Sequence, residues 1–298
     1  MVRQYKIHTN LDGTDDKVWD VTNGKVRFYQ PSNLGLQSTN NIWQSNGIGV
    51  MGTRSITQPQ IEFKLETFGE SLEENYQLMK DFINDILNQK FVTLEYQTEI
   101  FQVYADLALA DVTKTEGYGK NGTFSEKITF DIITKWYTYE NLTFEKIQNG
   151  QVLSGKSKIY GGTAPGSYKY VEGISYTYYG ESDIDRLSRW DIKDEIFSFM
   201  GILYPQLPKT PTGVRFLDDI GNEYTAIVFK TEQLQNYILI NTDVNDEIYQ
   251  GWNGTTSLNL FPVMDFERYR TRIIEKGQME LINLAKAEFK IKRKADFI

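Results

Sequence analysis

Five Asn-Gly dipeptides constrain the fold of this sequence more than any other local feature. Asn and Gly both tolerate a positive φ angle, so the pair favours the tight turns that join antiparallel strands. The pairs are Asn23-Gly24, Asn46-Gly47, Asn121-Gly122, Asn149-Gly150 and Asn253-Gly254. Turns of this kind, spread along the whole chain, predict a protein built mainly of β-strands.

Alternating apolar and polar residues support the same prediction. Ile61, Phe63 and Leu65 alternate with charged residues, which is the period of a half-buried strand. The first Asn-Gly pair has Trp19 and Val21 before it and Val26 and Phe28 after it, which predicts a hairpin. The pattern recurs at Ile128/Phe130/Ile132, Val214/Phe216, Ile238/Ile240 and Phe289/Ile291.

One segment, residues 71–89, is predicted to be an α-helix. Ser71 and Glu74 have the spacing of a capping box, in which each side chain accepts a hydrogen bond from a backbone N–H of the first turn. Apolar residues then recur at helical spacing on one face, at Leu72, Tyr76, Met79, Ile83 and Ile86. We interpret this stripe as packing on the chain's own sheet, in preference to a groove for a partner.

The length of 298 residues allows two domains. We place the boundary near residues 136–140, because a predicted strand ends before it and Gly and Pro become frequent after it. The predicted fold class is therefore mainly β with one clear α-helix, comprising a β domain at 1–135 and a second at 136–281. The Tyr- and Gly-rich stretch within about 145–190 is too loosely patterned for a core, and we expect exposed loops or an arm-like extension there.

Composition excludes several classes of protein. A formal charge of −8 argues against nucleic-acid binding, which needs a basic face. The chain has no Cys, so disulfides and thiolate chemistry are excluded. We expect no signal peptide and no membrane-spanning segment, because neither the N-terminal stretch nor any other run is apolar enough. Aromatic residues make up 14% of the chain, which suggests sheets and contact surfaces.

Two glycine motifs resemble nucleotide-binding loops. Residues 150–157 (GQVLSGKS) match the phosphate-binding pattern, which requires a helix directly after it. Gly161, Gly162, Pro165 and Gly166 leave no room for that helix, so we interpret the match as a turn. Residues 47–52 match G-x-G-x-x-G, but Pro59 and a strand follow where a helix is needed, and we interpret them as a flexible glycine loop.

Residues suited to catalysis or metal binding are few. His8 is the only His, and we interpret it as an exposed or structural imidazole instead of a catalytic base. Asp243, Asn245 and Glu247 have alternate spacing that calcium ligands use, but a polar turn between strands is the preferred interpretation. We therefore predict no catalytic residue, no cofactor and no metal ligand.

Sugar binding and a basic patch stay open as alternatives. Trp252 and the group Tyr176, Tyr178 and Tyr179 could stack on sugar rings, although sheet packing or protein contact is the default interpretation. The last predicted strand carries Lys290, Lys292, Arg293 and Lys294. These cations form either a basic patch or a charged edge that discourages unwanted strand pairing.

The order of elements in the first 135 residues resembles the distal tail proteins of long-tailed phages of Gram-positive bacteria, and lactococcal ones most closely. A hairpin is followed by a glycine-rich segment, a long strand, the capped helix, another strand and a closing strand that runs into aromatic residues. These are residues 19–30, 45–55, 59–69, 71–87, 91–98 and 126–140. The resemblance extends over the whole chain.

The resemblance implies an architecture. The first domain would be a β-barrel or sandwich with a helix, and six copies of it would close into a ring. The second would be a galectin-like β-sandwich, in some members with an arm that grips receptor-binding proteins. The last strand, at about 282–298, would return to the first domain.

The resemblance also implies a function: a structural virion protein, the hub of a tail-tip baseplate used for host attachment. It would be assembled in the host cytoplasm and located at the distal end of the tail. The implied partners are further copies of the chain, the major tail tube protein, the tail-tip protein and the receptor-binding protein. We expect no membrane contact, and DNA only passes through the ring.

The alternative function is a carbohydrate-binding β-sandwich that recognises host cell-wall saccharide. The second domain contains no His, whereas galectins use one to bind sugar, and this counts against the alternative. A glycosidase with two carboxylates is weaker still, because 40 acidic residues offer many pairs without indicating one.

Overall fold

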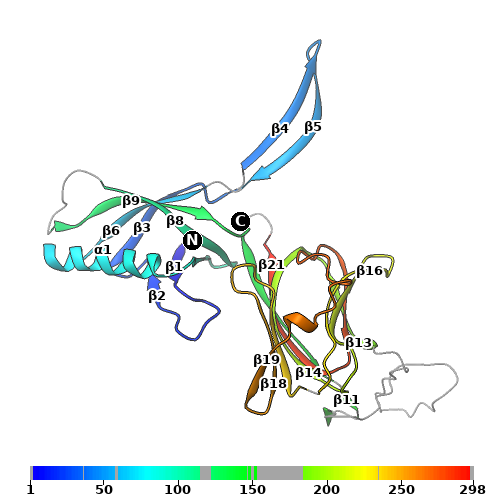
Figure 1. The fold of residues 1–298 in the computed structure, drawn as a ribbon. Helices are drawn as coiled ribbons and strands as arrows, with labels where there is room; N and C mark the ends of the chain where they lie inside the picture. The colour runs from blue at the N-terminus through cyan, green and yellow to red at the C-terminus, as the bar shows by residue number, and fades with distance from the viewer. Residues whose placement is uncertain are drawn as a thin grey trace. The chain divides into compact units, whose positions relative to one another are not determined.

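The computed structural model describes residues 3–35, 37–57, 60–114, 122–145, 147–148, 151–152, 184–233 and 235–295. The chain divides into two compact units (Figure 1). Unit 1 comprises Met1–Thr138 with Ala295–Ile298, and unit 2 comprises Tyr139–Lys294. Strands dominate both units, and α1 is the only α-helix in the described ranges. The predicted fold class, mainly β with one clear helix, is confirmed.

Unit 1 contains an antiparallel sheet of seven strands. Their order is β2 (Val18–Asp20), β1 (Gln4–His8), β7 (Val92–Gln97), β8 (Gln102–Thr113), β9 (Ser125–Ile132), β6 (Ile61–Thr67) and β3 (Val26–Ser32). No ladder joins β2 to β3 in the part of the chain that the structure describes, so the sheet does not close into a barrel. The alternation predicted at Ile61, Phe63 and Leu65 is present, because all three are buried.

The hairpin predicted around Asn23-Gly24 does not form. The chain does turn there, with the Gly24 N–H donating to the Asp20 carbonyl. However, β2 pairs with β1, and β3 pairs with β6. The prediction was wrong because tertiary pairing overrode a local turn preference.

Helix α1 (Leu72–Leu87) begins as predicted, with the Glu74 N–H donating to the Ser71 side chain over 3.2 Å. Its buried face differs from the predicted stripe. Ile86 is buried, whereas Leu72 and Tyr76 are exposed. Phe82 occupies the central position, because its ring packs edge-on against Trp19 and Phe28.

Strands β4 (Gln37–Ser45) and β5 (Ile48–Thr57) form a separate two-stranded hairpin. Cross-strand pairs run from Gln37↔Thr57 to Ser45↔Ile48. Asn46 and Gly47 form the turn with φ angles of 51° and 79°. The interpretation of residues 47–52 as a flexible loop is therefore wrong: they are a tight turn followed by a strand, and no helix opens there.

Unit 2 is a sandwich of two sheets. In the first the order is β19 (Thr256–Asn259), β18 (Ile248–Asn253), β17 (Tyr237–Asn241), β14 (Ile196–Pro205), β21 (Leu284–Lys294) and β10 (Tyr137–Glu145). In the second it is β13 (Ile184–Ile192), β20 (Gly277–Ile282), β15 (Thr212–Leu217) and β16 (Glu223–Phe229). Side chains from both sheets share one core, for example Phe199, Ile240 and Phe289 from the first sheet with Phe216 and Met279 from the second.

The remaining elements are short. Strands β11 (Ile147–Gln148) and β12 (Gln151–Val152) pair with each other, and η2 (Phe261–Val263) is a single 3₁₀ turn. Much of the predicted arm, at 149–150 and 153–183, lies outside the described residues. So do Tyr176, Tyr178 and Tyr179, and all of the 150–157 motif except Gln151 and Val152.

The last strand differs from the prediction in two respects. We expected residues 282–298 to return to the first domain, but β21 belongs to unit 2, and only Ala295–Ile298 group with unit 1. Nor is β21 an edge strand, because it lies between β14 and β10. The reason is that Phe289 and Ile291 are buried in the core of the sandwich.

Candidate assembly surface

The β4–β5 hairpin carries an unusual concentration of exposed apolar side chains. All residues of β4 are exposed, as are those of β5 up to Ser55. Five large apolar side chains near the turn are between 49% and 70% exposed: Ile42, Trp43, Ile48, Val50 and Met51. Contiguous apolar surface of this kind marks an interaction site.

These side chains occupy both faces of the hairpin. Residues directly opposite each other in a ladder share a face. Trp43 pairs with Val50 on one face. Their chain neighbours Ile42 and Met51 pair with each other and lie on the other face. In β6, by contrast, one face is buried and the other is only partly covered. A hairpin that is apolar on both faces needs a partner on both.

The hairpin is also almost free of charge. Arg54 is the only charged residue in 37–57, and its Nε donates to Asn40 Oδ1 over 3.0 Å. Charged residues make up 24% of the chain as a whole. Interface cores are depleted of charge, and an isolated two-stranded hairpin is only marginally stable in water. The β4–β5 hairpin is therefore the candidate assembly surface.

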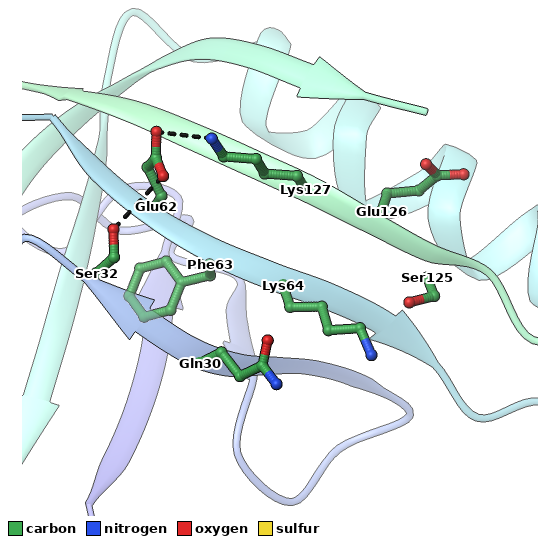
Figure 2. A pocket seen from close by; sticks show the side chains of 8 residues that line it. All are labelled: Gln30, Ser32, Glu62, Phe63, Lys64, Ser125, Glu126 and Lys127. Atoms are coloured by element: carbon green, nitrogen blue, oxygen red, sulfur yellow. Dashed lines mark hydrogen bonds and ion pairs between the residues drawn. The ribbon is translucent and has the colours of Figure 1, made fainter. Parts of the chain in front are cut away.

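The surface hollow of Figure 2 lies over strands β3, β6 and β9. Lys127 Nζ lies 2.8 Å from Glu62 Oε1, and Ser32 Oγ donates to Glu62 Oε2 over 3.4 Å. Lys64, on the same strand as Glu62, pairs with Glu66. Because these charges pair with one another, we interpret the hollow as a salt-bridged sheet surface.

His8 is structural, which was one of the two predicted possibilities. Its Nδ1 lies 2.7 Å from Asp16 Oδ2 and its Nε2 lies 2.9 Å from Glu95 Oε2. Burial raises the pKa of Glu95, but hydrogen bonds from Lys6 and His8 outweigh it and hold the pKa below its usual value. The imidazole thus ties the loop after β1 to strand β7.

The Asp243–Glu247 segment is the polar turn that the sequence favoured. The Asn245 N–H donates to Asp243 Oδ1, and Glu247 accepts from the Tyr249 hydroxyl. Asp243 forms a buried ion pair with Lys292 over 2.9 Å. Within the described ranges, no three His, Asp or Glu side chains are grouped to hold a metal ion.

Three cations of β21 contact acidic or aromatic side chains of unit 2. Lys292 pairs with Asp243, and Arg293 lies 3.3 Å from carboxylate oxygens of both Glu140 and Asp194. Lys290 Nζ lies 4.0 Å from the centre of the Tyr139 ring. These contacts favour neither a basic patch nor a charged edge.

Trp252 takes its default role in sheet packing. Its ring stacks on Tyr237, which lies directly opposite in the β17–β18 ladder, with ring centres 6.0 Å apart. No helix among the described residues has the length and apolar character needed to cross a membrane.

Sequence reasoning did not single out the assembly surface, although a signal was present. Residues 37–57 carry one charge and two adjacent apolar pairs, Ile42-Trp43 and Val50-Met51, on either side of an Asn-Gly turn. A two-stranded hairpin cannot bury these side chains by itself. Asn46-Gly47 was among the predicted turns, but the residues after it were interpreted as a flexible loop, so the strand that carries Val50 and Met51 was missed.

Comparisons with known proteins agree with this architecture. The family model "Distal tail protein, N-terminal domain" matches residues 4–133, and "Dit, C-terminal domain" matches residues 135–298. The distal tail proteins of Lactococcus phages p2 and SK1 are 93% and 91% identical to this chain, over all of both sequences.

Solved structures extend the comparison. A chain in the phage P2 baseplate, solved in its activated conformation with Ca, is 93% identical and covers all of both chains with a TM-score of 0.80. The Dit protein of phage SPP1, described as a paradigm of the hub adsorption apparatus, is 10% identical. It matches with a TM-score of 0.53 over 99% of this chain and 100% of its own, and so supports the fold alone. With both family models matched along nearly its full length, the chain belongs to the distal tail protein family.

Proposed function

We propose that this protein is a structural hub of a phage tail baseplate, and that six copies close into a ring through unit 1. The observation that carries the proposal is the β4–β5 hairpin, whose apolar faces are exposed and nearly uncharged. A second copy of the chain supplies the missing cover. The relatives support the setting, since one of them is part of a solved phage baseplate.

The mechanism that we propose is geometric. A contact between two different surfaces, repeated with constant rotation, closes a ring. The ring would continue the tail tube and leave a channel through which DNA passes. Unit 2, as a galectin-like sandwich with an arm within 145–190, would then present receptor-binding and tail-tip proteins with matched symmetry.

This role requires no catalysis. Both nitrogens of the one imidazole lie within hydrogen-bond distance of carboxylates, and these contacts tie the loop after β1 to strand β7. We therefore propose that the chain is not an enzyme.

The test is the solution mass of the purified chain, measured by size-exclusion chromatography with light scattering. We expect a species of six times 34.6 kDa, or a multiple of it. The double variant Trp43→Ser/Val50→Ser should remain monomeric, because it removes two of the three large apolar side chains on one hairpin face. The matched control is Ile220→Ser, which removes an apolar side chain that is 84% exposed in a turn of unit 2. Assembly of the double variant as fully as the control would contradict a role for the hairpin.

A further inference from the structure

Unit 1 carries a second exposed apolar surface, which we term the helix-start patch and define as Tyr29, Phe68, Leu72 and Tyr76. These four side chains are between 36% and 59% exposed. Tyr29 comes from β3, Phe68 follows β6, and the other two come from the first turns of α1. The patch thus lies where the end of the sheet meets the beginning of the helix.

Contacts show that the patch is continuous. The Phe68 ring centre lies 6.2 Å from that of Tyr29, and the Arg27 guanidinium lies over Phe68 at 4.6 Å. Tyr76 lies beside Phe124, with ring centres 6.5 Å apart. The Phe124 carbonyl accepts from the N–H of Thr67, the neighbour of Phe68, and the Phe124 N–H donates to Thr67 Oγ1. The surface is therefore already assembled in the isolated chain, which lowers the entropic cost of binding.

Backbone contacts fix Leu72 in this surface. A Cβ atom placed on Gly122 would lie 2.8 Å from Leu72 Cδ1, so the glycine backbone packs directly under the leucine. Helix α1 meanwhile turns Phe82 and Ile86 into the core of unit 1. The helix is thus apolar on two sides, and its own sheet covers one of them.

Charge favours the hairpin as the occupant of the patch. Glu70 and Glu73 flank Leu72 and are exposed. Arg54 is the single charged residue of the hairpin and has the opposite sign. Complementary charges at the rim of an apolar contact set its register and favour the correct partner.

We propose that the β4–β5 hairpin of one copy docks on the helix-start patch of the next copy, with Arg54 directed toward Glu70 and Glu73. The inference rests on the proposed ring and names the two surfaces that form its repeated contact. Hairpin and patch are different surfaces of one chain, so each copy uses both. This is the head-to-tail contact that generates closed rings.

Cross-linking tests the contact directly, because the chain has no Cys of its own. Ser38→Cys places a thiol two residues from Asn40, which lies opposite Arg54 in the ladder, and Glu73→Cys places one on the patch without touching the Ser71–Glu74 cap. With a short bis-maleimide, the double variant should form a ladder of covalent multimers that ends at the ring. Each single variant should give no ladder. The matched control, Ser38→Cys with Asp219→Cys in an exposed turn of unit 2, should give none either.

The outcomes separate the inference from the proposed ring. A sixfold mass with no ladder from Ser38→Cys/Glu73→Cys, or with an equal ladder from the control, overturns the docking site and leaves the ring standing. A chain that remains monomeric and gives no ladder overturns both.

Charge reversal tests the register. Arg54→Glu alone and Glu73→Arg alone should each weaken assembly about two- to fivefold, as expected for exposed pairs, and their combination should restore it. A double variant that assembles no better than either single one would overturn the proposed pairing of Arg54 with this rim.

Discussion

Two hairpins in this molecule have an Asn-Gly pair at the turn, but only one of them is joined to a larger sheet. Asn46-Gly47 closes β4–β5, which pairs with no other described strand. In β18–β19, Asn253 ends β18 and Gly254-Thr255 form the turn. Strand β18 also pairs with β17, and Tyr249 reaches the sandwich core. An Asn-Gly turn therefore permits a hairpin, and the neighbouring strands determine whether that hairpin joins the fold, is left for a partner or, as at Asn23-Gly24, does not form.

The largest loss of stability should follow from breaking the buried ion pair at Asp243, in the turn between β17 and β18. Asp243→Ala removes the carboxylate partner of buried Lys292 and should lower the free energy of unfolding by about 3–5 kcal/mol. Denaturant unfolding measures the change. Asp243→Leu combined with Lys292→Met should recover most of the loss, because it replaces both charges with apolar groups. A single variant as stable as the parent chain would mean that the ion pair is not needed for stability.

Core truncation should next distinguish β17, the strand that holds the β18–β19 hairpin in the sandwich, from β4–β5. Ile240 is fully buried opposite Tyr249, so Ile240→Ala should cost about 2–5 kcal/mol in denaturant unfolding. Val50→Ala should change the stability of the monomer by no more than about 0.5 kcal/mol, because Val50 is exposed. Equal losses at the two sites would show that the hairpin packs within its own chain, and the comparison would fail.

Of the two hairpins, alkaline pH should affect only β18–β19, because Tyr249 lies in β18. Burial, followed by the hydrogen bond to Glu247, raises the pKa of Tyr249. The folded state therefore holds this proton more tightly than the unfolded chain, whose Tyr pKa is about 10. Stability is intact below that pH and should fall by about 1.4 kcal/mol per pH unit above it. Tyr249→Phe should reduce the slope by that amount, whereas β4–β5 contains no acid to contribute one.

What could be predicted from sequence follows the same division between local and distant causes. The Ser71 cap and the β6 alternation depend on residues within a few positions, and both predictions are confirmed. The location of β21 depends on pairing with β14, which is far away in the sequence, and that prediction was wrong. Phe82 was missed because its role depends on Trp19 and Phe28, which a helical pattern does not reveal.

The smallest effect is expected from Gly→Ala substitutions in the two turns, which should differ in where hydrogen exchange becomes faster. Gly47 and Gly254 have φ angles of 79° and 65°, and no atom lies within 4 Å of a Cβ placed on either. Gly→Ala at each should therefore cost a similar backbone strain of roughly 1–2 kcal/mol. In β18–β19 the ladder to β17 should hold the strands in register, whereas β4–β5 has no such support and should open. Hydrogen exchange of the monomer should show faster exchange along β4 and β5 in Gly47→Ala, and only near the turn in Gly254→Ala. Equal spreading of fast exchange along both hairpins would mean that neighbouring strands do not stabilise β18–β19, and the contrast drawn from the sheet pairing would be lost.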